Sequence, residues 1–165
     1  MQKCFYLICP TDFLENTINK KFNFENYFYS SLGNSFNYDC KTITYIKNLI
    51  EKHNIKEIYF VLSLDNKIIL DAIGKQRFSN IKVLGNFYNE IIKEEGQSKK
   101  LFQERNSQFS ILSYYLNKKI KELKTQLVNT SNLSIKIGGK IYNKDKNTFT
   151  NIYSDLVCLK KHQLN

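Results

Sequence analysis

The sequence contains little of several residue types that mark particular classes of protein. In 165 residues it has one proline, no tryptophan and two histidines. Its four cysteines are far apart and form no CxxC pair: Cys4, Cys9, Cys40 and Cys158. This pattern indicates a reduced cytoplasm rather than a disulfide-bonded secreted domain. No secretory signal opens the chain, and no apolar run approaches the roughly 18 residues that a membrane span requires. We therefore expect a cytoplasmic protein with no membrane contact.

Arginine is also scarce, although the net charge is +10. Only Arg77 and Arg105 among the 25 basic residues are arginines, and the rest are lysines. Nucleic-acid and phosphate sites favour arginine for its planar, bidentate guanidinium. The surplus of lysine, asparagine and isoleucine is typical of an AT-rich genome. We expect a solvated basic surface that makes weak, salt-sensitive contacts with nucleic acids, rather than a dedicated nucleic-acid face.

The sequence has enough apolar and aromatic residues to fold. Hydrophobic residues make up 42% and aromatic residues 14% of the chain, well above the content of disordered chains. A chain of this length usually forms one domain, and it buries about two thirds of the surface that the unfolded chain would expose. We therefore predict a single domain over residues 1–165.

Hydrophobic patterning predicts alternating strands and helices. Buried strands are predicted at 3–9, 25–31 and 56–63, a short strand at 81–85, helices at 41–53 and 66–73, one or two helices over 99–127, and a hairpin over 133–154 around "NKDKN". Pro10 ends the first strand, Gly33 supplies a turn, and Asp39 caps the first helix. The order predicts an α/β fold, a mainly parallel sheet flanked by helices with a C-terminal hairpin at one edge.

Polar residues gather where the third strand turns into a helix. The stretch "FVLSLDNKIILDAI" places Ser63, Asp65 and Asn66 at that turn. These residue types are preferred helix N-caps, so the turn would select them with no ligand present. The carboxyl ends of parallel strands also form the crevice where α/β proteins bind ligands, so a small-molecule or anion site is the alternative interpretation.

Four local sequences, in order, resemble the β-carbonic anhydrases over nearly the whole chain. "CPTDF" (9–13) stands where that family has CxDSR, and "SSLGN" (30–34) where it has an RNAGN-like turn. "LSLDNK" (62–67) stands at the GHxxCG motif, and "IGGKIYNKDKNTFT" (137–150) at the closing strand and hairpin. The resemblance implies the β-carbonic-anhydrase fold.

The same resemblance implies that the family's zinc chemistry is missing. Its three zinc ligands correspond to Cys9, Ser63 and Asn66, of which only the first is a customary zinc ligand. Its Asp and Arg pair corresponds to Thr11 and Phe13, with Asp12 one residue late. Without zinc, the hydroxide that the family generates from water is lost. We therefore expect no metal, no cofactor and no catalytic residue.

We predict a crevice at the strand ends that acts in binding, regulation or scaffolding and could accept a small anion. It would be formed by nine residues: Cys9, Thr11, Asp12, Ser30, Gly33, Asn34, Ser63, Asp65 and Asn66. In the family, a helical arm that wraps a partner subunit precedes the first strand, whereas only Met1 and Gln2 precede that strand here. We therefore expect that a homodimer would use another part of the sheet.

Two alternatives remain open. The first is a hydrolase or lyase with unconventional zinc ligands or with Cys9 as nucleophile, although His53 and His162 are predicted to lie far from it. The second is a basic nucleic-acid-binding protein that uses exposed aromatic residues such as Tyr27, Phe36 and Tyr38.

Overall fold

The protein is built on one five-stranded sheet. The structure, a computed structural model, describes residues 2–101, 107–127 and 135–152. The strand order is β2-β1-β3-β4-β5, with the first four strands parallel and β5 antiparallel to β4. The strands are β1 (Lys3–Ile8), β2 (Glu25–Ser30), β3 (Glu57–Ser63), β4 (Lys136–Asn143) and β5 (Thr148–Asn151).

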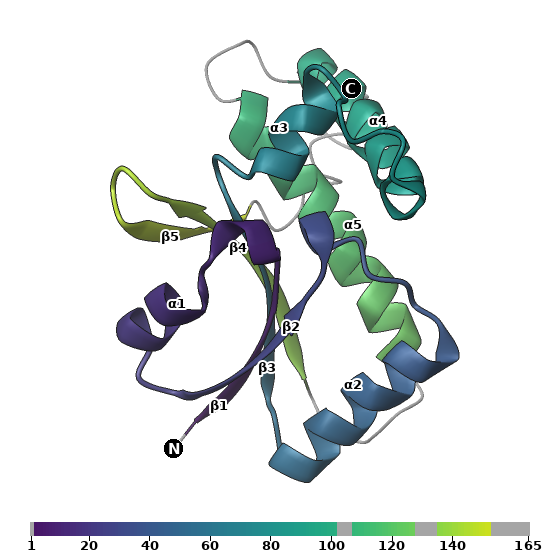
Figure 1. The fold of residues 1–165 in the computed structure, drawn as a ribbon. Coiled ribbons are helices and arrows are strands. Elements are labelled where there is room, and N and C mark those ends of the chain that lie inside the picture. Colours follow the sequence, from purple (N-terminus) through teal and green to yellow (C-terminus); the bar gives the residue numbers. More distant parts are fainter. Residues whose placement is uncertain (1, 102–106, 128–134, 153–165) are drawn as a thin grey trace, which may run out of the picture.

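Helices cover both faces of this sheet, but unequally (Figure 1). They are α1 (Glu15–Lys21), α2 (Cys40–His53), α3 (Lys67–Ile73), α4 (Gly85–Leu101) and α5 (Ser107–Leu127). In Figure 1, α2 and α5 lie on one side of the sheet and the short α1 on the other. Three 3-10 turns complete the described elements: η1 (Pro10–Asp12), η2 (Leu32–Asn34) and η3 (Lys82–Leu84).

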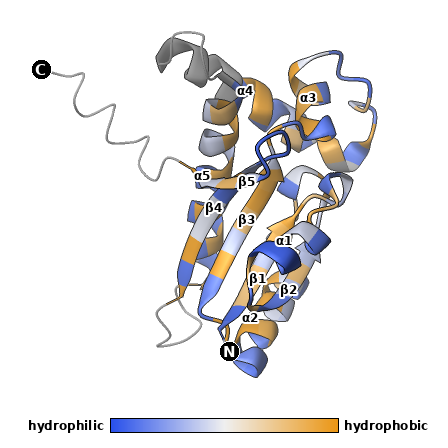
Figure 2. Cartoon of the chain, turned by 90° about the vertical axis from the view of Figure 1, so that its left-hand side faces the viewer, coloured by the Kyte–Doolittle hydropathy of each residue, from blue (hydrophilic) through white to orange (hydrophobic). Residues whose placement is uncertain are grey.

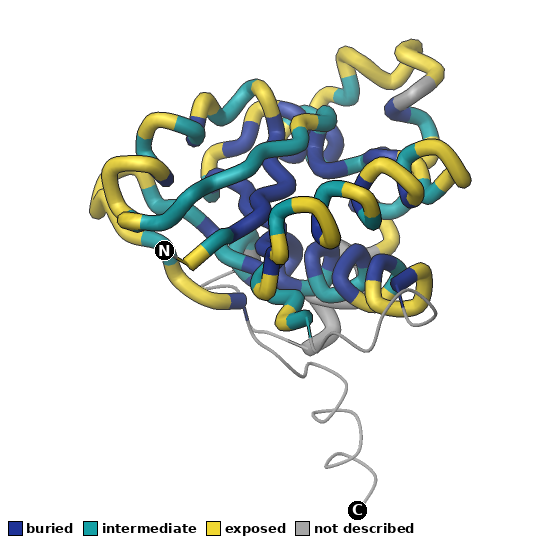
Figure 3. The backbone as a smooth tube through the Cα atoms, turned by 90° about the horizontal axis from the view of Figure 1, so that it is seen from below, coloured by how far each residue is buried: buried dark blue, intermediate teal, exposed yellow. Residues whose placement is uncertain are grey.

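The alternation of side chains along the strands divides the core into two clusters. On β3, Ile58, Phe60 and Leu62 pack with α2, α4 and α5, while Tyr59 and Val61 pack on the side of α1. Both clusters need apolar residues, so the central strands are apolar on both faces, as expected for a parallel sheet covered by helices. Figure 3 shows the buried segments of the backbone tube gathered in the middle of the molecule.

The predicted fold class is confirmed, and most predicted elements are correct. The strands at 3–9, 25–31 and 56–63 and the helices at 41–53 and 66–73 are found within two residues of their expected bounds. The predicted caps are also present: Asp39 Oδ1 accepts from Thr42 N at 2.8 Å, and Asn66 Oδ1 accepts from Ile69 N at 3.0 Å. The hairpin joins the sheet at one edge, where β4 pairs with β3. Its predicted residues 133–134 and 153–154 lie outside the described part.

Two parts of the prediction are wrong. The strand expected at 81–85 is instead η3 leading directly into α4, because Leu84, Phe87, Tyr88 and Ile91 recur at helical spacing and are all buried. Helix α1 was not predicted, since Ile18 is its only buried residue and its sequence has no apolar periodicity. Within 99–127, two separate helices are found, and α4 begins earlier than predicted, at Gly85.

Candidate functional site

The order of the strands brings three chain segments together at one end of the sheet. Strand β1 lies between β2 and β3, so the chain passes from β1 to β2 in one direction across the sheet and from β2 to β3 in the other. Crevices in open α/β sheets lie at such a change of direction, beyond the carboxyl ends of the strands. The segments that follow β1, β2 and β3 therefore meet, and they carry the predicted crevice residues.

The first group in the crevice is built around Cys9, directly after β1. Its side chain is fully buried, and its Sγ lies 3.1 Å from Thr11 Oγ1 and accepts the Gly33 N–H, also at 3.1 Å. Gly33 has φ +59, and a Cβ there would lie 2.7 Å from the ring of Phe87. Only glycine fits this position without strain, and its amide is thereby aimed at the sulfur.

The second group is built around the carboxylate of Asp12. Asp12 Oδ2 accepts the backbone N–H of Ser63 at 2.8 Å, and Oδ1 accepts the Asn66 side-chain amide at 2.7 Å. Burial raises the pKa of Asp12 to about 6, although both hydrogen bonds act in the opposite direction. The chain thus places its own carboxylate against the start of α3, where a bound anion would otherwise find its donors.

The side chains of the β3 turn are also paired with one another. The Ser63 hydroxyl donates to Asp65 Oδ1. Asn66 is 1% exposed; its NH₂ donates to Asp12 Oδ1, and its Oδ1 accepts from Ile69 N, which makes it the cap of α3. The capping interpretation of this turn is confirmed for Asn66, whose side-chain oxygen and nitrogen both form hydrogen bonds within the protein.

The remaining predicted residues differ in how closely they approach. Asn34 is fully buried; its Nδ2 donates to Val61 O at 3.0 Å, while its Oδ1 has no hydrogen-bond partner among the described residues. Asp65 is exposed and lines a cavity of about 170 Å³ beside the hairpin. Ser30 is exposed at the end of β2, and none of the hydrogen bonds found within the described residues joins its side chain to the other eight predicted crevice residues.

The residues at the three implied zinc-ligand places do not suit zinc. Cys9 supplies a sulfur, but the Ser63 hydroxyl and the Asn66 amide are held by hydrogen bonds to the protein itself. Zinc is normally held by three or four Cys, His or carboxylate donors. Throughout the described ranges, no three His, Cys, Asp or Glu side chains are grouped closely enough to hold a metal ion.

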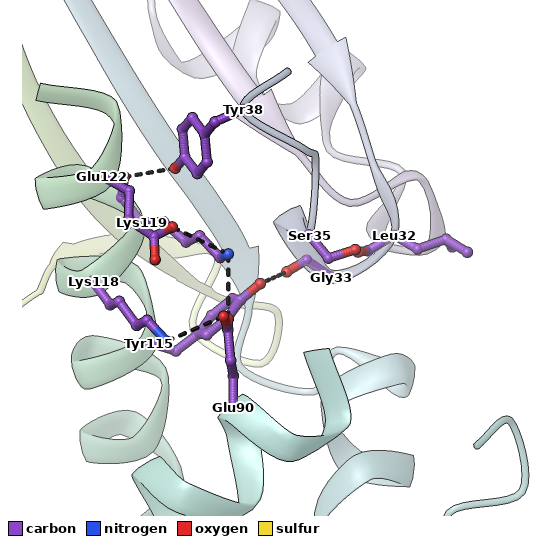
Figure 4. A network of polar contacts seen from close by, with 9 residues as sticks. All are labelled: Leu32, Gly33, Ser35, Tyr38, Glu90, Tyr115, Lys118, Lys119 and Glu122. Carbon is purple, nitrogen blue, oxygen red and sulfur yellow. Dashed lines mark hydrogen bonds and ion pairs between the residues drawn. The ribbon is translucent and has the colours of Figure 1, made fainter. Parts of the chain in front are cut away.

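A polar network beneath the crevice was not predicted from the sequence. The Tyr115 hydroxyl donates to Gly33 O at 2.7 Å, and Lys119, one turn further along α5, lies 3.2 Å from Glu90 Oε2 and 3.3 Å from Glu122 Oε2 (Figure 4). The Lys119 side chain is only 8% exposed, so its charge depends on these two partners. The network fixes the η2 turn against α5. The signal available was the i, i+4 spacing of Tyr115 and Lys119 on the apolar side of the helix.

The aromatic residues and the histidine that the alternative functions would use make contacts within the fold. Phe36, which the nucleic-acid alternative requires on the surface, is only 6% exposed because it packs in the core. The Tyr38 hydroxyl donates to Lys119 O at 2.8 Å, and the Tyr27 hydroxyl donates to Glu25 and lies 2.7 Å from His53 Nδ1. His53 is half-buried at the end of α2, and His162 and Cys158 lie outside the described residues.

Within the described residues, none of the helices is both long and apolar enough to cross a bilayer. No protein-family model matches the chain, and no curated protein sequence matches it.

Solved structures with the same fold are β-carbonic anhydrases. The chain is similar to the wild-type β-carbonic anhydrase CafD of Aspergillus fumigatus, with a TM-score of 0.71 at 12% identity over 93% of this chain and 90% of that one. For CafA of the same fungus the TM-score is 0.70 at 11% identity, over 99% and 81%. A structure reported as one of two tetrameric β-carbonic anhydrases from Sordaria macrospora gives 0.68 at 12% identity, over 92% and 80%.

Proposed function

We propose that this chain, which has the fold of the β-carbonic anhydrases, is a non-catalytic binding or scaffolding module that has no zinc centre. The observation that supports this most directly is the state of Asn66. Its amide caps α3 and holds the carboxylate of Asp12, so it serves the fold at a place where the resemblance implies a zinc ligand. The crevice groups stabilise the chain rather than a reacting molecule.

Both forms of the enzymatic alternative, the zinc site and the thiol nucleophile, depend on Cys9. A zinc site would need its sulfur, and a thiol mechanism would need it accessible beside a base. The sulfur is instead fully buried, with Thr11 and Gly33 as its hydrogen-bond partners. His53, the one histidine among the described residues, lies 2.7 Å from the Tyr27 hydroxyl instead, so neither hydrogen-bond partner of Cys9 is a base that could take its proton.

The binding role belongs to a surface other than the crevice. A small anion in the crevice would have to replace the Asp12 carboxylate at the Ser63 amide, where the two oxygen acceptors would compete for one donor. We include in the proposal a cytoplasmic location and a homodimer formed at a sheet edge. Sedimentation velocity at several protein concentrations would test the dimer.

The experiment that tests the non-catalytic role is a measurement of CO₂ hydration by stopped flow, in buffer supplemented with Zn²⁺. The control is a Cys9→Ser variant, which removes the sulfur required by either catalytic mechanism. We expect both proteins to match the buffer rate. Turnover above that rate in the wild type, lost in the variant, would overturn the proposal.

A further inference from the structure

A basic cavity lies at the edge of the sheet that carries β4, away from the crevice. Its volume is about 370 Å³, and its walls come from α5 and from the first half of β4. The described residues that line it include three lysines, Lys124, Lys136 and Lys140, and no aspartate or glutamate. Isoleucines, asparagines, glycines and Tyr59 form the rest of the lining. A cavity with this balance of charge favours an anionic occupant.

Two of these lysines lie over one aromatic ring. Lys140 Nζ is 4.7 Å and Lys136 Nζ is 5.9 Å from the centre of the Tyr59 ring. Burial and the neighbouring Lys136 lower the pKa of Lys140. Glu57 is a carboxylate close to this pair, 3.6 Å from Lys136 Nζ, and its other oxygen is taken by the Tyr59 hydroxyl. One carboxylate balances one lysine, which leaves positive charge on this face of the sheet.

The third lysine lies on the other face of the sheet, where the cavity continues. Lys124 is exposed in the last turn of α5, and none of the ion pairs within the described residues includes it. Ile120 and Asn117, one and two turns earlier on the same helix, line the cavity with it. The cavity therefore extends around the edge of β4, with positive charge available on both faces.

Among the described residues, no strand pairs with the first half of β4 along its outer edge. Lys136 N donates to Lys56 O at 2.9 Å, and Tyr142 O accepts from Leu64 N at 2.7 Å, so the even-numbered residues of β4 bond toward β3. In a parallel strand the next residues point the other way. Ile137 and Gly139 therefore face outward. Strand β5 pairs with residues 140–143, and the N–H of Ile152 donates to Gly139 O. Within the described residues, no backbone partner is found for the N–H or the C=O of Ile137, or for the N–H of Gly139.

In the part of the chain that the structure describes, this edge has room for a second backbone beside Ile137. Figure 2 shows the first half of β4 as the outer border of the sheet, below the hairpin. Gly138 and Gly139 are required by the fold itself, since a Cβ on Gly138 would lie 3.1 Å from the Tyr59 ring and one on Gly139 2.6 Å from Ile152 Cδ1. Edge strands of this kind can add a strand from a bound peptide.

We propose that an extended acidic segment of a partner protein binds here by adding a strand to the outer edge of β4. Its backbone would pair with both groups of Ile137 and with the Gly139 N–H, and its successive side chains would direct carboxylates to Lys136 and Lys140 on one face and to Lys124 on the other. This inference rests on the proposed function in one respect, since it supplies the partner of a binding module. A second copy of this chain fits this edge less well than another part of the sheet, because its own β4 edge would bring the same three lysines against these.

The test uses the full-length protein and a fluorescent peptide that repeats Glu-Glu-Val-Val, which places carboxylates on both faces of a strand, with binding followed by anisotropy. One control peptide has lysine in place of each glutamate. A second is N-methylated at every other residue on the pairing side, which removes its N–H donors and keeps its charge. We expect the first peptide alone to bind, with an affinity that falls as salt rises. Equal binding of the N-methylated peptide would overturn strand addition.

Protein variants separate this edge from the general basic surface. The Lys124→Gln/Lys136→Gln variant removes two cavity charges, and Lys121→Gln/Lys144→Gln removes two exposed charges from α5 and the hairpin outside the cavity. We expect about fivefold weaker binding for the first and less than about twofold for the second. Equal losses in both variants would mean non-specific attraction and would refute the site.

Hydrogen exchange identifies the occupant. The amides of Ile137 and Gly139 should exchange quickly in the free protein and become protected when the peptide binds. Protection before peptide is added would overturn the proposal, because a second copy or residues 153–165 would then occupy the edge. Carbonic anhydrase turnover in the same sample would refute the non-catalytic role and leave the docking site standing. Absence of peptide binding in an inactive sample would do the reverse.

Discussion

The partly buried carboxylate of Asp12 should make the stability of this protein depend on pH in an unusual direction. Most paired carboxylates in proteins have lowered pKa values and stabilise the fold above them. Burial instead raises the pKa of Asp12 from 3.8 to about 6. The folded state therefore holds this proton more tightly than the unfolded chain does. The stability that Asp12 contributes is fully present below about pH 4 and is lost as the pH rises through 6.

The magnitude follows from the size of the shift. At 1.36 kcal/mol per pKa unit, a rise from 3.8 to about 6 corresponds to about 3 kcal/mol of unfolding free energy. Asp12→Asn replaces the carboxyl group with an amide of the same shape that does not ionise. The variant loses a hydrogen bond at every pH, because its NH₂ faces the Asn66 NH₂. Relative to the wild type, its free energy of unfolding should therefore rise by about 2 kcal/mol between pH 4 and pH 7, because part of the effect already develops below pH 4.

Urea unfolding followed by circular dichroism, at several pH values from 4 to 7, measures this difference for the two proteins. All other ionisable groups are shared, so their pH dependence cancels in the comparison. A difference that is constant with pH, or one that falls, would refute the reasoning. It would mean that the hydrogen bonds from Ser63 and Asn66 outweigh the burial of the charge.

Three further substitutions test the packing around the crevice, with unfolding free energy as the measurement. Gly33→Ala should cost at least about 2 kcal/mol, because of its φ of +59 and an aromatic ring 2.7 Å from the added Cβ, whereas Gly85→Ala has open space and should change little. Asn66→Ala should cost about 3 kcal/mol, since a cap and a carboxylate partner are both lost, against about 1 kcal/mol for the exposed cap in Asp39→Ala. Tyr115→Phe should cost about 1 to 2 kcal/mol through its buried bond to the η2 turn. Equal effects within either pair, or a neutral Tyr115→Phe, would contradict the geometry described here.

The sheet could be predicted from the sequence because its signals are local. The central strands are continuous apolar runs, Asp39 and Asn66 cap helices with their own side chains, and the "NKDKN" turn marks the hairpin. The order of the polar turns along the chain then identified the fold, which the similarity to solved β-carbonic anhydrases supports at 9% to 16% identity.

The contacts inside the crevice could not be predicted in the same way. Asp12 stands one residue after the place where the resemblance implies an aspartate, and only the 3-10 turn of η1 brings its carboxylate to Ser63, 51 positions later. The bond from Tyr115 to Gly33 spans 82 positions. Such pairs depend on how α5 packs against the sheet, and a periodic pattern places a residue on a face without naming its partner.

The central claim is that the fold of the β-carbonic anhydrases is present here without a zinc centre. Its most direct test is the zinc content, by mass spectrometry, of tag-free protein purified without chelator, with Cys9→Ser prepared in parallel. The account predicts less than about a tenth of an equivalent per chain in both proteins, since three protein ligands are the least that such a site uses. About one equivalent in the wild type, lost in Cys9→Ser, would contradict it and restore a metal centre to the crevice.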